Sequence, residues 1–397
     1  MKYGLTDAQR EFQARFDAVC RERIAPRARE ADRSGEVPRE SWRDLVDSGF
    51  LRLFHGPEHG GLGADGVTQG LAMESLARAC ASTFWTVSIS AVLAGKMLSE
   101  LCGPSHHKEW LAPILAGDKI GAFAATEDGA GSDPASYRTT LRRTSDGLRL
   151  RGGKSRISNA CTADVAVVLA RRDEPTGPTL CYVVVDLCKR GVLRRELPKL
   201  GLQGMSWGTI GFDDVEIAAE DVIVGASIEK TLQVVEWGQL MQAWCGIGVA
   251  QAAFEAAQAH AQTRSAFGRP LAHLEIVHGR LADMQVAIDA ARLLTLEVSW
   301  LKGRGRAARE LVLLAKIEAT EMAVRVADQA MRNFGGWGFS KQHPVERYYR
   351  DSLANVPAGL PTDRLRELIA CAMVEVDPWA YEPFDWLDAA GLRLGAV

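Results

Sequence analysis

The spacing of apolar residues divides the chain into three parts. Over residues 1–120, apolar positions recur every three or four residues, which predicts amphipathic helices with Thr6 as the first N-cap. From 121–225, short β-type runs alternate with Gly, Pro and Asp, which is typical of an antiparallel barrel or sandwich. Over 226–397, long Ala- and Leu-rich helical segments return. The pattern therefore predicts a mainly α-helical protein with a β insert.

The third part has the pattern of a four-helix bundle. Three long segments have apolar faces that suit such a bundle, and a shorter helix after Pro361 would close it. The tail from Glu375 is rich in Trp, Phe and Pro, so we expect it to pack on a surface or against a partner subunit. The predicted order is an N-terminal helical domain, a middle antiparallel β-barrel and a C-terminal four-helix bundle with an aromatic tail.

Composition narrows the class of protein. The formal net charge of -3 and the lack of a basic stripe argue against nucleic-acid binding. The eight cysteines form no CxxC pair and no Cys/His cluster with zinc spacing, so no metal site is predicted. The N-terminus does not resemble a signal peptide, and no apolar run approaches the roughly 18 residues of a membrane span. We therefore expect a soluble, cytoplasmic protein with no membrane partner.

A glycine-rich loop carries the strongest chemical signal. The stretch "AFAATEDGAGSDPASYRTT", residues 122–140, places hydroxyl side chains and glycines between β-type runs. Backbone N–H groups and hydroxyls in such a loop can hold a phosphate or the polar edge of a ring. A plain turn would explain a lone GxG, but the string TEDGAGSD at the boundary between helices and β-runs is more specific.

A set of strings resembles one family. In chain order they are "IAPRAREAD", "PEHGGLG", "ATEDGAGSD", "GGKSRISNA", "RSAFGRPLAHLEIVHGRLADM", "FGGWGF" and "HPVERYYRD". Through them the chain resembles the acyl-CoA dehydrogenase family over essentially its whole length. The resemblance implies the three-part fold predicted above, one FAD per subunit, and a homodimer or homotetramer.

One set of implied FAD contacts belongs to the β domain. Phe123, Ala125 and Thr126 would lie along the isoalloxazine ring, with Thr126 near its polar edge. Ser132 would hydrogen-bond the pyrophosphate, and Ser158 would lie near the reactive N5 edge.

A second set of implied contacts belongs to the C-terminal helices. Arg264 and Phe267 would reach the FAD of a neighbouring subunit, at the pyrophosphate and near the adenine. Gly335 and Gly336 would let the backbone approach the dinucleotide closely. The alternatives are a surface salt bridge for Arg264 and core packing for Phe267.

The chain departs from the family at the catalytic base. The family uses a carboxylate to remove the α-proton of an acyl thioester while a hydride leaves to the flavin. The usual base position falls at Gly359, or at Ala358 with a shift of one residue, and the alternative position on an earlier helix falls at Gly238. Glu236 is near, but two residues are about 200° of helix rotation. We expect Glu236 to face away from the site as a solvated carboxylate.

Two further departures flank the expected flavin. The family has Trp where this chain has Arg156, and Gln where it has Arg332. Arg156 would add a positive charge that stabilises reduced flavin or a substrate carboxylate. Trp207 is a weak candidate for the lost aromatic face, since Trp in a strand is usually part of the core.

These departures leave the reaction open. The first hypothesis is an FAD-dependent oxidoreductase acting on an acyl thioester, on CoA or an acyl carrier protein, with non-standard chemistry. Relatives of that kind occur in antibiotic and polyketide biosynthesis. The second is a two-component flavin monooxygenase with a flavin reductase partner, and the third is a flavin-binding subunit without catalysis. For the first, Gly359 would open space over the flavin, unless the loop between Pro357 and Pro361 has moved and other side chains close the pocket.

Overall fold

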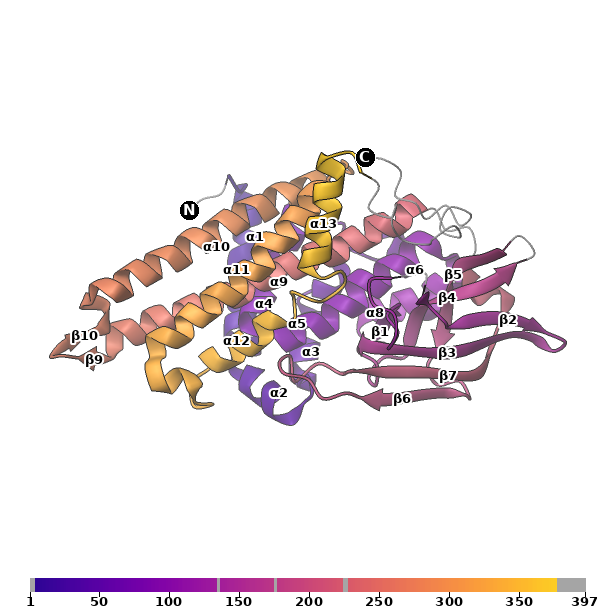
Figure 1. The fold of residues 1–397 in the computed structure, drawn as a ribbon, viewed down its shortest axis with the longest axis horizontal. Coiled ribbons are helices and arrows are strands. Elements are labelled where there is room, and N and C mark those ends of the chain that lie inside the picture. The colour runs from indigo at the N-terminus through magenta and orange to yellow at the C-terminus, as the bar shows by residue number, and fades with distance from the viewer. Residues whose placement is uncertain (1–3, 134–135, 175–176, 224–227, 377–397) are drawn as a thin grey trace.

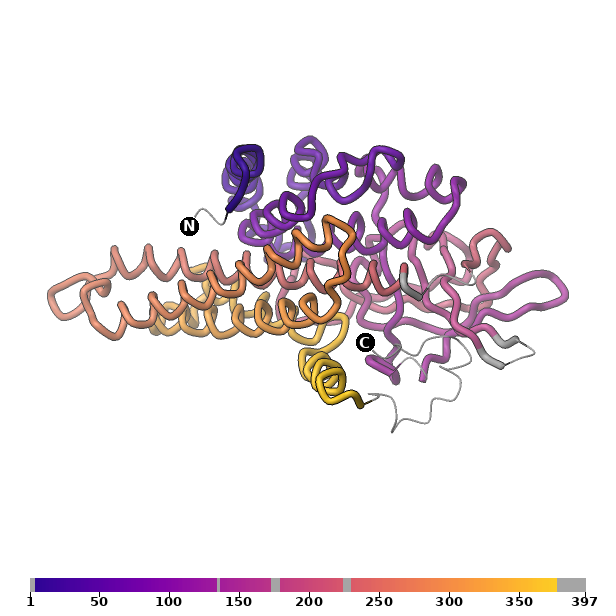
Figure 2. Tube along the Cα trace, turned by 90° about the horizontal axis from the view of Figure 1, so that it is seen from above, coloured from indigo at the N-terminus to yellow at the C-terminus, as the bar shows by residue number. Residues whose placement is uncertain are grey.

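The computed structural model describes residues 4–133, 136–174, 177–223 and 228–376. Figure 1 shows an N-terminal group of helices, a twisted sheet and a long C-terminal group of helices. Figure 2 shows the N-terminal helices along one side of the C-terminal helices and the sheet at one end of them. The predicted order of helical, β and helical parts is confirmed.

The N-terminal part begins as predicted. Thr6 caps α1 through a capping box, in which its hydroxyl accepts from the Gln9 backbone N–H and the Gln9 side chain accepts from the Thr6 backbone N–H. The helices are α1 (Asp7–Val19), α2 (Ala28–Ser34), α3 (Arg39–Asp47), α4 (Gly66–Ala79), α5 (Ala81–Ser88), α6 (Gly95–Leu101), α7 (Pro104–His106) and α8 (Ala112–Ala116). Short 3₁₀ and π segments join them: η1 (Cys20–Ile24), η2 (Ala25–Arg27), η3 (Phe50–Arg52), η4 (Pro57–His59), η5 (Ile89–Ala94) and η6 (His107–Leu111).

The continuous helical segment Ala81–Leu101 is apolar enough to span a membrane by length and composition. Within the described residues it is the one segment that passes that test, and 89% of its most apolar 18-residue window is buried inside the structure. Core helices that are covered on all sides have the same composition. Its apolar character is therefore explained by the core of this protein.

The middle part is an eight-stranded mixed sheet. Its strands are β1 (Gly121–Ala124), β2 (Thr140–Thr144), β3 (Gly147–Ser158), β4 (Val165–Glu174), β5 (Gly177–Asp186), β6 (Val192–Glu196), β7 (Trp207–Ile217) and β8 (Val222–Ile223). The order is β6-β7-β3-β2-β4-β5-β8, with β1 paired to β4. Most pairs are antiparallel as expected, but β1–β4 and β2–β4 are parallel. The sequence pattern could not predict the parallel pairs, because the alternation of residues in a short strand does not depend on the direction of its neighbour.

The C-terminal part contains the three long helices predicted. They are α9 (Ile228–Thr263), α10 (Glu275–Lys302) and α11 (Arg309–Phe334), followed by η10 (Gly335–Phe339), α12 (Val345–Leu353) and α13 (Thr362–Met373). Helix α13 follows Pro361 as expected, whereas α12 was not foreseen. A small hairpin, β9 (Ser265–Ala266) and β10 (Arg269–Pro270), and the turn η9 (Leu271–His273) join α9 to α10. The aromatic tail after residue 376 lies outside the described residues.

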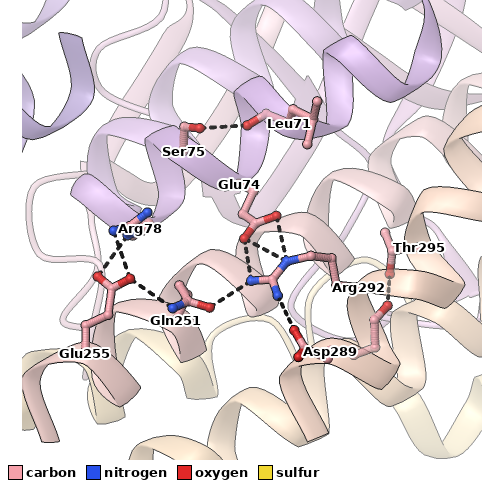
Figure 3. Close-up of polar contacts among 10 residues, drawn as sticks. Leu71, Glu74, Ser75, Arg78, Gln251, Glu255, Asp289, Arg292 and Thr295 are labelled. Carbon is pink, nitrogen blue, oxygen red and sulfur yellow. Dashed lines mark hydrogen bonds and ion pairs between the residues drawn. The ribbon is translucent and has the colours of Figure 1, made fainter. Parts of the chain in front are cut away.

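A buried polar network joins the N-terminal and C-terminal helices (Figure 3). The Glu74 carboxylate on α4 accepts hydrogen bonds from two nitrogens of Arg292 on α10, the shortest of which is 2.7 Å. Arg292 also donates to Gln251 on α9 at 2.8 Å, and Gln251 donates to Glu255 at 2.9 Å. Glu255 then pairs with Arg78 of α4 at 2.8 Å. Each charged group in the network has a partner of opposite charge on another helix. The network therefore fixes the positions of α4, α9 and α10 relative to one another.

Candidate flavin and acyl site

A buried ion pair holds the glycine-rich loop that follows β1. Glu127 accepts hydrogen bonds from the backbone N–H groups of Arg138 and Thr139, at 2.7 and 3.0 Å. Lys154 of β3, whose side chain is fully buried, donates to the same carboxylate at 2.7 Å. Burial opposes ionisation of Glu127, but these hydrogen bonds hold its pKa below the usual value. These contacts tie the described parts of the loop, 125–133 and 136–139, to each other and to β3.

The predicted flavin contacts of this loop keep their side chains accessible. Phe123, Thr126 and Ser132 are each half-buried, and so is Ala125. A Cβ added at Gly129 or Gly131 would meet no atom within 4 Å, so the loop is open on that side. This geometry fits a flat ring and a phosphate lying against the loop.

Arg156 is directed to this loop rather than into open space. It lies at a register shift between β3 and β7, with φ of 59°. Its guanidinium donates to the Glu127 carbonyl oxygen at 2.6 Å and to the Asp128 carboxylate at 3.3 Å. Ser158, half-buried, pairs with Trp207 across the same two strands. Trp207 is half-buried and packs against the edge of the large helical core.

Asn159 is a positioning residue that the sequence reasoning missed. Its side chain is fully buried, and its Nδ2 donates to the carbonyl oxygens of Thr86 and Gly121, at 2.9 and 3.1 Å. These bonds tie the end of β3 to helix α5 and to β1. The left-handed φ of 64° at Asn159 suits an asparagine in a turn. The string "ISN" contained this signal, but only the fold shows what the amide contacts.

The second set of predicted contacts lies around a hollow of about 680 Å³ at the far end of the helices. Arg264, Arg332, Gly335 and Gly336 all line it. Gly335 has φ of 57°, and a Cβ added at either glycine would meet nothing within 4 Å. The Arg264 guanidinium forms no ion pair with the described residues, and Arg332 pairs with Asp328 at 2.7 Å. Two guanidiniums and an open glycine backbone fit an anionic group.

Phe267, in the turn between β9 and β10, is the most exposed of these candidates. Its side chain is 91% exposed and its φ is 55°, so the alternative of core packing is wrong for this residue. The hollow beside it also contains His260, which the sequence reasoning missed. The His260 ring stacks on Phe334 at a centroid distance of 4.0 Å. Burial and the neighbouring His343 lower the pKa of His260.

One chain does not bring the two sets together. Figures 1 and 2 both show the β9–β10 hairpin at the opposite end of the molecule from the sheet. Helix α9, which leads from the sheet side to the hairpin, has 36 residues and is therefore about 54 Å long. A single cofactor can touch both sets only if a second chain brings its hairpin to the sheet.

The expected base positions carry no acid. Gly359 lies in a loop with φ of 65°, and a Cβ added there would lie 3.2 Å from Nε2 of Gln242 on α9. Gly238, on the same helix, would place a Cβ 3.3 Å from Leu93. The Gln242 carboxamide thus occupies space beside Gly359 that the sequence hypothesis had left open. That space is not simply empty.

Lys316 of α11 holds the loop on both sides of Gly359. Its Nζ donates to the Ala358 carbonyl oxygen at 2.6 Å and to the Leu360 carbonyl oxygen. The side chain is fully buried, and burial lowers the pKa of Lys316 to about 7. No sequence motif indicated this contact, because Lys316 and Ala358 are 42 residues apart in the chain.

Glu236 differs from the sequence expectation in one respect. It is 8% exposed and pairs with Lys302 and with Arg309, so the expectation of a solvated carboxylate is wrong. A charge in the core requires such partners, and both come from elements far along the chain. The paired carboxylate is held by these two cations rather than beside Gly359.

The three-part fold and the loop held by Glu127 and Lys154 define a class of protein. Among the described residues, no three His, Cys, Asp or Glu side chains are grouped to hold a metal ion. The arrangement is that of a flavin-dependent oxidoreductase with helical domains on both sides of a β domain.

The chain belongs to the acyl-CoA dehydrogenase family. Its residues 6–118, 122–215 and 228–374 match the N-terminal, middle and C-terminal domains of acyl-CoA dehydrogenases. The bovine mitochondrial short-chain specific acyl-CoA dehydrogenase is 32% identical over 333 residues, 83% of this chain and 81% of the relative. Benzylmalonyl-CoA dehydrogenase of Aromatoleum aromaticum is 31% identical, over 93% of this chain and 99% of the relative.

The fold agrees with a solved member of the family. Butyryl-CoA dehydrogenase of Megasphaera elsdenii superposes with a TM-score of 0.88 at 27% identity, over 94% of this chain and 100% of the other. The prediction of an oxidoreductase related to acyl-CoA dehydrogenases is confirmed, and so is FAD as the cofactor of the family.

Proposed function

We propose that the protein oxidises an acyl thioester through FAD without the carboxylate that removes an α-proton. The observation that supports the proposal is that Gly359 and Gly238, the two positions that the resemblance assigns to the family's base, carry no carboxylate. A carboxylate beside the α-carbon is required when that carbon must lose a proton. When an alcohol or amine carbon is oxidised, its hydrogen leaves as hydride to the flavin and the proton leaves from O–H or N–H, where water can accept it. We therefore propose an acyl group with a hydroxyl or amino substituent.

The carrier of the acyl group is CoA or an acyl carrier protein, and the setting is the biosynthesis of a specialised metabolite such as an antibiotic or polyketide. This part of the proposal rests on the resemblance to relatives that lack the base. The cytoplasm is the proposed location.

The residues that would hold FAD come from two chains in a homodimer or homotetramer. The loop with Thr126 and Ser132, together with Ser158, would orient the ring and pyrophosphate, and Arg264 of a second copy would neutralise phosphate charge. When bound, FAD supplies the acceptor for the hydride that leaves the substrate. Arg156 would keep the loop beside the ring in place through its bond to the Glu127 carbonyl oxygen. A separate electron acceptor would reoxidise the cofactor.

The test is anaerobic mixing of the FAD-loaded protein with acyl thioesters while the flavin absorbance is followed. We expect butyryl-CoA and octanoyl-CoA to reduce the flavin poorly, because general base catalysis typically contributes about 10²–10⁴-fold. We expect hydroxyacyl or aminoacyl thioesters to reduce it faster. Turnover of butyryl-CoA at rates usual for the family would overturn the proposal.

A two-component flavin monooxygenase would lack the same carboxylate. It would bind flavin loosely, need a reductase and consume oxygen, whereas the proposed enzyme is purified with FAD and reduced anaerobically by substrate. A flavin-binding subunit without catalysis would give neither reaction. The same anaerobic experiment, repeated with oxygen and a flavin reductase, separates the three.

A further inference from the structure

Two glutamine side chains of α9 are buried with unused hydrogen-bonding capacity. Gln239 is 4% exposed and Gln242 is 6% exposed. The Oε1 atom of each is buried and accepts no hydrogen bond from the described residues. A buried amide oxygen without a donor is unfavourable, so this pair requires an explanation.

The two glutamines share one face of α9 with Gly238. Residues three and four positions apart are neighbours on a helix surface, which places Gln242 beside both Gly238 and Gln239. Gln242 lies against Gly359, as its 3.2 Å separation from an added Cβ shows, and Gly238 lies against Leu93. Leu93 and Phe123 pack against the same apolar cluster. This face of α9 therefore runs from the base position towards the predicted flavin contacts.

The chemistry of this face is specific. A neutral carboxamide cannot take the α-proton, but its oxygen accepts a hydrogen bond from a hydroxyl or an amine. An apolar acyl chain would leave both oxygens unpaired. A substituent with an O–H or N–H group would satisfy one of them.

We propose that Gln242 and Gln239 form a polar subsite beside Gly359 that accepts a hydrogen bond from a hydroxyl or amino group on the substrate's acyl chain. The proposal rests on the proposed function, because it requires an acyl thioester to lie along this face. The two glutamines would determine which substrate binds. They take no part in the hydride transfer itself.

The subsite has a fixed frame. The loop that contains Gly359 is held by Lys316 through two carbonyl oxygens, and Gln242 lies on a helix whose core side is packed. A prearranged acceptor of this kind discriminates between substrates that differ by a single hydroxyl.

The experiment compares lactoyl-CoA with propionyl-CoA, which differ by one hydroxyl. Each is mixed anaerobically with the FAD-loaded protein in a stopped-flow instrument, and binding is taken from the rapid change in flavin absorbance that precedes any reduction. We expect the wild type to bind lactoyl-CoA about 2- to 10-fold more tightly, the range of one neutral hydrogen bond. Gln242→Leu should remove this preference by weakening lactoyl-CoA alone.

Control variants separate the subsite from folding. Gln242→Met keeps most of the side-chain volume and should behave as Gln242→Leu does. Gln262→Leu changes an exposed glutamine of the same helix and should keep the preference. FAD content and melting temperature are measured for each variant, so that one that fails to fold is recognised. In that case Gln239→Met is used to test the subsite in its place.

Two results would contradict the subsite while leaving the acyl thioester function intact. One is equal binding of the two thioesters by the wild type, and the other is a preference that survives in both Gln242→Met and Gln239→Met. If neither thioester perturbs the flavin of the wild type at millimolar concentration, the proposed function itself is wrong and the subsite falls with it.

Discussion

Gly359 limits what a substitution at the base position can reveal. A glutamate there would have to adopt φ of 65°, which side chains other than glycine rarely accept, and its Cβ would lie 3.2 Å from the Gln242 amide. A failure of Gly359→Glu to restore α,β-dehydrogenation would therefore reflect strain as much as geometry. Gln242 offers a cleaner position, because Gln and Glu have the same shape.

We predict that Gln242→Glu increases the rate at which butyryl-CoA reduces the flavin. The carboxylate would stand beside Gly359 on an unstrained helix, and even the low end of base catalysis is about 10²-fold. Stopped-flow absorbance under anaerobic conditions measures the rate, and Gln262→Glu on the exposed part of α9 is the control. An unchanged rate in a variant with full FAD content would show that Gln242 does not border the α-carbon.

Asp351 of α12 provides a pH-dependent contribution to stability. Burial raises its pKa from 3.8 to about 6, although the Leu202 backbone N–H donates to it at 2.6 Å. The folded state therefore holds the proton more tightly than the unfolded state, and this contribution is lost as the pH rises from about 4 to 6. Asp351→Asn resembles the protonated form and keeps an acceptor for Leu202.

We predict that the melting temperature of Asp351→Asn minus that of the wild type is more positive at pH 7.5 than at pH 4.5. The exposed carboxylate of Asp363 gives the control Asp363→Asn, which should show no such trend. A difference between variant and wild type that does not change with pH would contradict the titration of Asp351 in this range.

At the scale of elements, the loop after β1 depends on one buried ion pair. Glu127 and Lys154 hold it in place of regular secondary structure. Removing one partner leaves a buried charge without compensation, which typically destabilises a protein by about 3–5 kcal/mol. The same change should release the side chains that face the cofactor.

We predict that Glu127→Ala lowers both the melting temperature and the affinity for FAD. Differential scanning calorimetry and fluorescence titration with FAD measure the two effects. Glu216→Ala removes an exposed glutamate of β7, whose ion pair with Arg149 lies at the surface, and should change both by little. Full FAD affinity in a folded Glu127→Ala protein would show that the loop does not contact the cofactor.

At the scale of the whole molecule, the two sets of predicted cofactor residues lie at opposite ends of the folded protein. We predict that FAD binding and self-association are linked. Arg264→Ala should weaken FAD binding by about 1.5–3 kcal/mol, since a charge-assisted phosphate contact is lost. Light scattering and FAD titration test this together, and Arg269→Ala on the same hairpin is the control. A monomer with full FAD occupancy would contradict the prediction.

The sequence by itself determined the long helices, the β-rich middle part and the family. The capping box at Thr6, the long helices and the strings around TEDGAGSD depend on neighbouring residues, so they can be recognised without a fold. For the same reason the absence of a carboxylate at Gly359 and Gly238 was visible at once. Parallel pairing of β1 and β2 with β4 was not, because register is set by contacts between strands distant in the chain.

Only the tertiary structure decided what surrounds those positions. Glu236 was expected to be solvated but is buried, because Lys302 and Arg309 reach it from 66 and 73 residues away. Gln242 and Lys316 carried no motif, yet they lie on either side of the Gly359 loop. A side chain's chemistry can be read from its letter, but its partners depend on chain segments that only folding brings together.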